Sequence, residues 1–249
     1  MERLIAATAV AEQNHFWFRG LRRFVRPLLA LAVTGCRDPQ ILDCGCGTGA
    51  NLAMLTEFGR AQGLDREWSG VRRARSAGRL VNRASVTQLP FGDECFDLVT
   101  SFDVLYSLET PAEQAAAHEM YRVLRPGGRA IINVAAMPML RGNHSVLAHE
   151  VRRYTARGLR TMLEEAGFTI DRLTHTNATL VPILLPLRLI QRLCGLAQEH
   201  EAGQEILVPA RPINWLLDRL LALEAIFTLH ADLPVGSSLL VLARRPFAS

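Results

Sequence analysis

Residues 41–49 read Ile-Leu-Asp-Cys-Gly-Cys-Gly-Thr-Gly, an apolar run that ends in a loop with three glycines. Glycine removes the side chain where a backbone must turn tightly and approach a ligand. The spacing is G-x-G-x-G, whereas a dinucleotide fingerprint reads G-x-G-x-x-G and a nucleotide-phosphate loop contains G-K-S or G-K-T. The stretch therefore predicts a buried strand over 40–44, a ligand-facing loop over 45–49 and a helix from about Ala50.

Apolar strands alternate with helical segments along the chain on the C-terminal side of this loop. Further strands are expected at 61–65, 80–85, 96–102, 129–134, 168–176 and 237–244. Helices are expected between or beside them at 68–77, 111–124 and 156–166. Alternation of this kind is typical of an α/β fold with a parallel, doubly wound sheet.

The remaining segments extend this core within a single expected domain, residues 1–249. Residues 1–33 form an N-terminal helical cap with a break at Gly20, and residues 135–155 are irregular. Residues 178–235 form a helical insertion between the last two strands.

Composition narrows the range of functions. The chain is 49% hydrophobic, as in a globular protein, and all its basic residues are arginines. The absence of lysine excludes Schiff-base chemistry and a lysine general base. The arginines are scattered without interleaved aromatic residues, so a nucleic-acid partner is not expected.

The cysteines and the apolar segments indicate in which cellular compartment the protein is expected. The five cysteines lack zinc-ligand spacing, so no metal site is expected, and reduced thiols favour a cytoplasmic protein. We see no signal peptide at the N-terminus. The longest apolar stretch, 178–187, is interrupted by Pro182 and Pro186 and is too short to span a bilayer.

Asp65 closes the second expected strand, sixteen residues after Gly49. An acid at this place accepts hydrogen bonds from the ribose hydroxyls of a bound nucleoside. An acid binds the ribose of NAD in the same way, so this aspartate alone does not identify the cofactor. A helix-capping acid is the simpler alternative.

Four segments together resemble a known family. They read ILDCGCGTGANL at 41–52, GLD at 63–65, LPFGDECFDLVTSFDVL at 89–105 and YRVLRPGGRAIINV at 121–134. In order and spacing they are similar to the motifs of class I S-adenosylmethionine (SAM)-dependent methyltransferases, closest to those that act on small molecules. The resemblance implies a Rossmann-like, seven-stranded sheet of order 3-2-1-4-5-7-6 with its last strand antiparallel. The helical insertion departs from the family's short final hairpin.

The resemblance also implies a SAM site. Asp43 and the glycine-loop backbone would hold the amino-acid end of SAM, and Asp65 would hold the ribose. Arg66 stands where the family often has an apolar residue, and Ser85 where it often has an acid. The cofactor-binding residues expected in and beside these motifs are Asp43, Cys44, Gly45, Cys46, Gly47, Gly49, Asn51, Asp65, Arg66, Ser85, Val86, Ser101, Phe102, Asp103 and Tyr106.

Two further segments resemble a bacterial subgroup of the family. They are HFWFRG at 15–20 and RRYT at 152–155. Trp17 would help to close the cofactor site, and Arg19 could pair with the SAM carboxylate. Alternatively, the aromatic residues of the first segment pack in the core.

Methyl transfer needs a base only where the acceptor must lose a proton. The candidates are His15, His144, His149 and Tyr154, and the alternative for the histidines is a solvent-exposed loop position. The expected partner is a small-molecule acceptor that is lipid- or sugar-linked or a secondary metabolite.

Two apolar helical segments, 181–197 and 211–229, dominate the insertion. They could pack on each other and on the sheet, cover a lipid-like acceptor, or make a peripheral membrane contact. Two other functions stay open: a SAM-binding protein without methyl transfer, and an NAD-dependent oxidoreductase.

Overall fold

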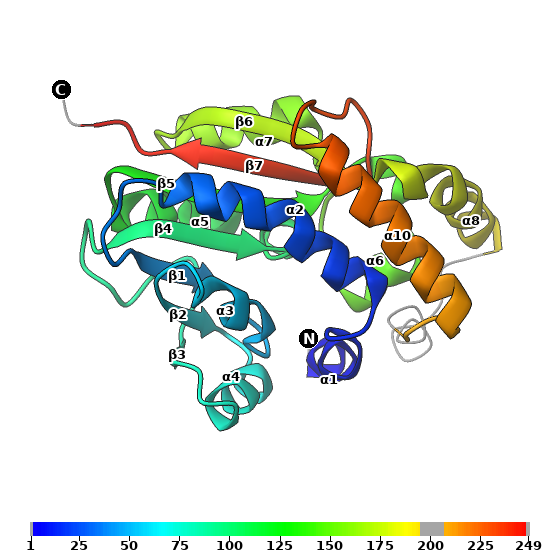
Figure 1. Ribbon diagram of the computed structural model, residues 1–249, viewed down its shortest axis with the longest axis horizontal. Helices are drawn as coiled ribbons and strands as arrows, with labels where there is room; N and C mark the ends of the chain where they lie inside the picture. Colours follow the sequence, from blue (N-terminus) through cyan, green and yellow to red (C-terminus); the bar gives the residue numbers. More distant parts are fainter. Residues whose placement is uncertain (1, 195–206, 248–249) are drawn as a thin grey trace.

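The structure is a computed structural model, and it describes residues 2–194 and 207–247. Within these residues, seven strands form one sheet in the order β3-β2-β1-β4-β5-β7-β6 (Figure 1). Their bounds are β1 Gln40–Cys44, β2 Arg60–Asp65, β3 Val81–Arg83, β4 Phe96–Phe102, β5 Leu124–Ala135, β6 Thr169–Thr176 and β7 Ser238–Arg244. This order confirms the expected fold class.

The sheet is parallel except where β7 enters it. β1 pairs in parallel with β2 and β4, and β4 pairs in parallel with β5. β7 runs antiparallel between β5 and β6. The carboxyl ends of β1, β2, β4 and β5 therefore meet at one edge of the sheet, where open α/β sheets bind their ligands.

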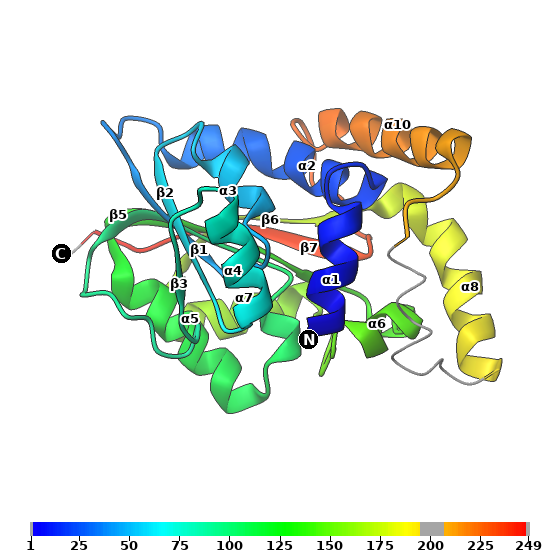
Figure 2. The same cartoon turned by 90° about the horizontal axis from the view of Figure 1, so that it is seen from below.

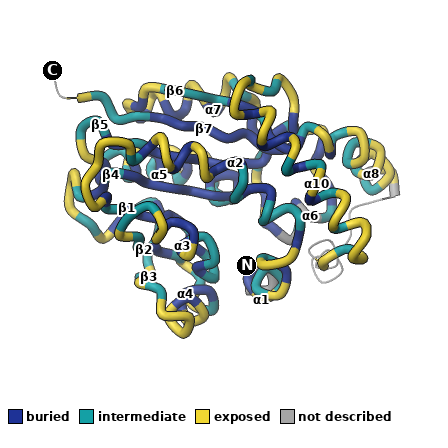
Figure 3. Tube along the Cα trace, in the orientation of Figure 1, coloured by how far each residue is buried: buried dark blue, intermediate teal, exposed yellow. Residues whose placement is uncertain are grey.

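Helices cover both faces of the sheet (Figures 1 and 2). α2, α3, α4 and α10 pack on one face through one buried apolar cluster, whereas α5 and α7 pack on the other face. The bounds are α1 Glu2–Ala11, α2 Phe16–Ala32, α3 Ala50–Leu55, α4 Trp68–Ser76, α5 Thr110–Val123, α6 Asn143–Leu147, α7 Ala156–Glu165, α8 Val181–Cys194 and α10 Arg211–Phe227. Figure 3 shows the central strands as the buried layer between them.

The expected helix break at Gly20 is wrong. The chain instead breaks between α1 and α2, where His15 caps α2 and its Nδ1 accepts the Trp17 N–H at 3.1 Å. Gly20 lies inside α2, where α10 crosses it. A Cβ there would stand 2.5 Å from Cδ1 of Leu221, so the glycine serves close helix packing.

The insertion holds α8 and α10, and α10 runs beside α2 in both ribbon views. Buried Asp218 receives two hydrogen bonds from the Arg23 guanidinium, at 2.6 and 3.0 Å. Buried Glu224 accepts the backbone N–H groups of Ala178 and Thr179, both at 2.9 Å. These polar contacts fasten α10 to the rest of the fold.

Two segments differ in extent or regularity from what the sequence predicts. The segment 135–155, expected to be irregular, contains the one-turn helix η2 (Pro138–Leu140) and α6. The first insertion helix, expected over 181–197, is described as far as Cys194, and its last expected residues lie outside the described part of the chain.

Gly20→Val is expected to lower the free energy of unfolding by about 1–3 kcal/mol, because added side-chain volume must push Leu221 and α10 away from α2. Urea denaturation measures the change. The matched control is Ala30→Val at an exposed position of the same helix, which costs only helix propensity, at most about 0.7 kcal/mol. Equal effects at both positions would contradict the packing role of Gly20.

Candidate active site

The loop that follows β1 depends on glycine at three positions. Gly45, Gly47 and Gly49 have φ angles of 81°, 53° and 79°, in the left-handed region that side chains disfavour. A Cβ at Gly45 would lie 2.3 Å from Cγ2 of Val104. The loop is fixed against β2, because the N–H groups of Gly45 and Cys46 donate to the Leu64 carbonyl.

A cavity of about 500 Å³ opens beside this loop, at the carboxyl ends of the strands. We call it the large cavity. Its walls come from α1, the start of α2, the glycine loop and the ends of β2 and β4. The expected site residues that line it are Trp17, Gly45, Cys46, Gly47, Asn51, Asp65, Arg66, Ser85, Val86, Phe102, Asp103, Tyr106 and His149.

Asp65 forms one wall of the large cavity and is already tied to the backbone around it. Its carboxylate accepts the Gly47 N–H at 2.8 Å and the Glu67 N–H at 2.7 Å. Burial raises the pKa of Asp65, and these two backbone hydrogen bonds oppose that rise. The bonds fix the carboxylate, whose remaining lone pairs can accept ligand hydroxyls.

Five of the expected cofactor-binding residues do not line the large cavity: Arg19, which is described below, and Asp43, Cys44, Gly49 and Ser101. Asp43 is buried beneath the loop, and the Thr100 hydroxyl donates to its Oδ1 at 2.7 Å. Its Oδ2 is buried and has no hydrogen-bond partner, and burial raises the pKa of Asp43 to about 7. Asp43, Cys44 and Ser101 lie in the strands below the cavity, whereas Gly49 packs against Ala74 of α4.

The expected contact of Arg19 with SAM is not supported. Arg19 forms an ion pair with Asp218 at 3.3 Å and lies outside the large cavity, because α10 supplies a buried carboxylate on that side of α2. Arg22, three residues later, lines the cavity instead. Its guanidinium donates to the Glu12 carbonyl at 2.8 Å and to Oδ1 of Asn51 at 3.4 Å.

A second cavity of about 210 Å³ adjoins the large one. We call it the small cavity. Its apolar walls come largely from η2, η3 (Ala178–Leu180), α8 and α10, and its polar groups include Glu150, Arg153 and Ser237. Four side chains line both cavities: Trp17, Phe18, Asp103 and Tyr106.

Asp103 is the carboxyl group at the junction of the two cavities. It has a φ of 61°, a strained value for a residue other than glycine, and such strain concentrates at functional sites. The Asn133 amide donates to its Oδ1 at 2.9 Å. Burial raises its pKa to about 7, mainly opposed by that hydrogen bond.

Glu150 is the other carboxylate of the small cavity, and it is neutralised. Arg153 donates to both of its oxygens, at 2.9 and 3.2 Å, and both side chains are largely buried. Asp103 therefore differs from Glu150 in lacking a bidentate arginine.

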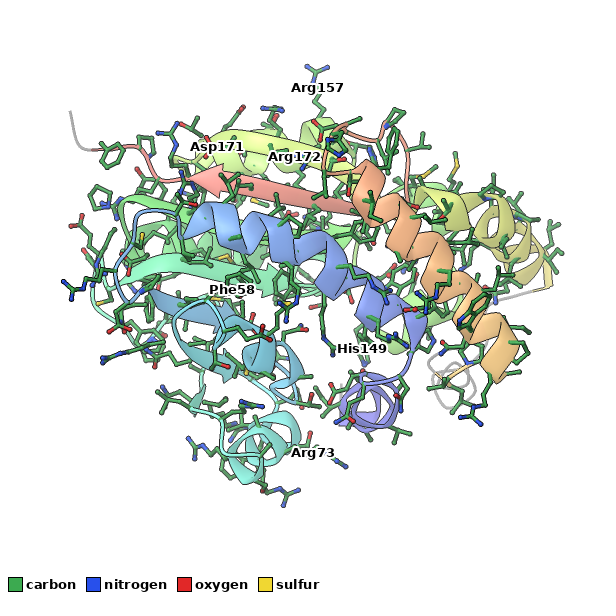
Figure 4. The ribbon with its side chains drawn as sticks, in the orientation of Figure 1. Phe58, Arg73, His149, Arg157, Asp171 and Arg172 are labelled. Atoms are coloured by element: carbon green, nitrogen blue, oxygen red, sulfur yellow. The ribbon has the colours of Figure 1, made fainter. Side chains whose placement is uncertain are left out.

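The structure separates the four expected bases. The Tyr154 hydroxyl donates to Glu113 at 2.6 Å and lines neither cavity, so its expected catalytic role is not supported. His15 lines the small cavity, and its Nδ1 accepts the Trp17 N–H, so this nitrogen caps α2. His149 is exposed and lines the large cavity (Figure 4). The His144 side chain lies outside what the structure describes.

The sequence did not reveal how α1 closes the large cavity. The Thr48 hydroxyl donates to Glu12 at 2.5 Å, and Cδ1 of Ile5 lies 3.6 Å from the Cβ position of Gly47. Burial raises the pKa of Glu12. No spacing pattern pointed to these residues, because α1 and the glycine loop meet only through the tertiary fold.

Other proteins share this fold and loop. Residues 42–132 match the family model described as a methyltransferase domain. Over these residues the chain is similar to class I, SAM-dependent methyltransferases. Over 150 residues it is 32% identical to a demethylmenaquinone methyltransferase of Mycobacterium tuberculosis, covering 59% of this chain and 57% of the relative. The chain thus spans little more than half the length of that relative.

Another relative and two solved structures are also similar to this chain. The chain is 30% identical over 167 residues to a probable S-adenosylmethionine-dependent methyltransferase of Mycolicibacterium smegmatis, covering 65% of this chain and 62% of the relative. A solved SAM-dependent methyltransferase from Thermotoga maritima superposes with a TM-score of 0.60 at 15% identity, covering 98% of this chain and all of that one. Another from Mesorhizobium loti gives 0.57 at 19% identity, covering 89% and 98%.

The residues of the large cavity fit SAM. The bare backbone at Gly45 and Gly47 leaves room for the amino-acid end of the ligand, and Asp65 offers a carboxylate to the ribose. Within the described part of the chain, no cluster of three His, Cys, Asp or Glu side chains could hold a metal ion.

Asp65→Ala is expected to weaken SAM binding at least tenfold, about 1.4 kcal/mol, because the hydrogen bonds to both ribose hydroxyls are lost. Isothermal titration calorimetry measures the affinity. Glu57→Ala, at an exposed carboxylate outside the cavity, is the matched control and should leave the affinity unchanged. An unchanged affinity in Asp65→Ala would show that the ribose lies elsewhere.

Proposed function

We propose that the protein transfers the methyl group of SAM to a small amphipathic acceptor that carries a hydroxyl group. The observation that carries this proposal is the pair of adjoining cavities with Asp103 at their junction. The large cavity holds SAM and the small cavity holds the acceptor. Methyl transfer requires the acceptor, the methyl group and the sulfur in line, and a junction lined from both sides provides that alignment.

Roles in the large cavity follow from position. Asp65 holds the ribose, and Arg66, Ser85 and Val86 lie along the adenine. The backbone of the glycine loop and Asn51 hold the amino-acid end. Arg22, rather than Arg19, provides the cation for the carboxylate of SAM. Trp17 shields the junction from water.

Asp103 acts as the general base. SAM supplies an activated methyl group when it is bound. The acceptor hydroxyl gives its proton to the Asp103 carboxylate while the hydroxyl oxygen forms a bond to the methyl carbon. The carbon–sulfur bond breaks, and its electron pair stays on sulfur. A carboxyl group with a pKa near 7 is well matched to accept a proton at neutral pH. Tyr106, beside it, stays neutral because burial raises its pKa.

The small cavity indicates the shape of the acceptor. Leu140, Leu180, Ile183, Leu184 and Leu217 line it with Phe16, which suits an apolar body or tail. Its polar groups suit a head group that forms hydrogen bonds. Relatives named demethylmenaquinone methyltransferase support this class, because demethylmenaquinone joins a polar ring to an apolar tail.

Two alternatives remain as outcomes of one experiment. The chain is incubated with SAM and a panel of amphipathic phenols and quinols, and S-adenosylhomocysteine is measured. Tight SAM binding without this product across the panel would favour a SAM-binding protein without methyl transfer. Binding of NADH instead of SAM would favour an oxidoreductase.

Asp103→Asn is expected to lower turnover about 100-fold or more and to leave SAM affinity within about twofold. Asparagine tolerates the left-handed backbone and keeps the bond to Asn133, so the variant should fold. Wild-type turnover should rise with pH through about 7, as the carboxyl group ionises, and the variant should lack that rise. An unchanged turnover or pH profile would remove Asp103 as the base.

A second measurement of Asp103 is independent of the acceptor. Its pKa of about 7 in the fold exceeds the ordinary value of 3.8, so the folded state binds the proton more tightly. Its contribution to stability is therefore full below pH 3.8 and is lost as pH rises through about 7. The free energy of unfolding should fall less steeply over this range in Asp103→Asn than in the wild type.

A further inference from the structure

Helix α10 buries its acids together with a few apolar residues. Leu221 and Ala225 pack in the core, while Asp218 pairs with Arg23 and Glu224 accepts the N–H groups at the start of η3. Asn214 accepts the Phe16 N–H at 2.9 Å and donates to the Asn14 carbonyl at 2.9 Å. A surface helix ordinarily turns its apolar stripe to the core and its charges to water.

The outer face of α10 is apolar. Six large apolar side chains of this helix are each more than half exposed: Ile213, Trp215, Leu216, Leu223, Ile226 and Phe227. Scattered exposed apolar residues are normal, whereas a continuous group on one helix marks a contact surface. In Figure 3 exposed residues recur along the whole length of α10.

The exposed charges of this helix have one sign. Both of its acids are buried, at 2% and 5% exposure, and its two exposed charged residues are Arg211 and Arg219. The Arg219 guanidinium lies 5.7 Å from the centre of the Trp215 ring. Arginine beside tryptophan suits the boundary between anionic head groups and acyl chains.

We infer that the outer face of α10 docks on an anionic lipid bilayer. The apolar stripe enters the head-group boundary, and the two arginines meet lipid phosphates. This contact is peripheral. Among the described helices, none is both long enough and apolar enough to cross a bilayer.

A second copy of the chain fits this face less well. In a symmetric dimer, Arg211 and Arg219 of each copy would face an α10 surface that offers no exposed acid to pair with them. Anionic lipid provides the missing negative charge. Charge complementarity therefore selects the bilayer over self-association.

The inference rests on the proposed function, because a bilayer at α10 would be the source of the amphipathic acceptor. α10 also contributes Leu217 to the small cavity, and α8 contributes Ile183 and Leu184. One helix thus borders the acceptor cavity on its inner side and presents an apolar face on its outer side. An acceptor with an apolar tail could pass from the bilayer to the cavity along this helix.

Vesicle sedimentation tests the inference. The full chain is mixed with vesicles of equal parts phosphatidylglycerol and phosphatidylcholine, or of phosphatidylcholine alone. The wild type is expected to partition at least tenfold more strongly to the anionic vesicles. Leu216→Ser with Leu223→Ser should lower that partition at least tenfold, and Arg219→Gln should lower the preference for anionic lipid. Leu80→Ser, at an exposed apolar site near β3, is the matched control and should bind like the wild type.

Two results would overturn the inference. One is wild-type partition no stronger than that of the double variant. The other is a wild-type dimer in light scattering that the double variant turns into a monomer, with no vesicle binding in either. SAM calorimetry on the same samples keeps the tests separate, because the α10 variants should retain full SAM affinity. Loss of SAM binding in the wild type would count against the proposed function, whatever the vesicles show.

Discussion

The close approach between the glycine loop and the end of β4 is the constraint on which the site depends. Gly45 is left-handed and leaves no space for a Cβ beside Val104, so the loop passes directly over the β4 terminus. That path frees the N–H of Gly47 to meet Asp65 at 2.8 Å. It also leaves Asp43 buried beneath the loop, with one carboxylate oxygen lacking a partner. The large cavity is the space that this path leaves open at the edge of the sheet.

Burial has opposite consequences for the carboxyl groups around the two cavities. Glu150 is buried with a bidentate arginine, so its charge is compensated and it serves structure. Asp103 is partly buried and has a single amide donor, so its charged form is disfavoured and its pKa rises to about 7. The residue at the junction is thus the carboxyl group that can gain and lose a proton near neutral pH. This difference depends on which partners the fold supplies, because both residues are ordinary acids in sequence.

Local patterns in the sequence were enough to predict the core of the fold. The strand at 40–44 and the place of the glycine loop follow from apolar periodicity and glycine spacing. The strand order follows instead from the resemblance of four ordered motifs to a known family. Features that depend on contacts between distant segments could not be predicted in this way. Arg19 and Arg22 are alike in sequence, and only the buried carboxylate of Asp218 draws the first away from the cavity. Tyr154 looks reactive until Glu113, 41 residues earlier, is found to hold its hydroxyl.

The same reasoning explains why the insertion resisted interpretation. Its two helical segments are apolar with few charges, and the distribution of those charges around α10 becomes meaningful only once the inner side of the helix is known. The acids are consumed by Arg23 and by the start of η3, which leaves apolar residues and arginines outside. Leu221 and Ala225 complete the inner side, so the apolar residues of the outer face are not needed to pack α10 on the fold. Since exposing them to water lowers solubility, their retention on the outer face is best explained by an apolar surface that covers them.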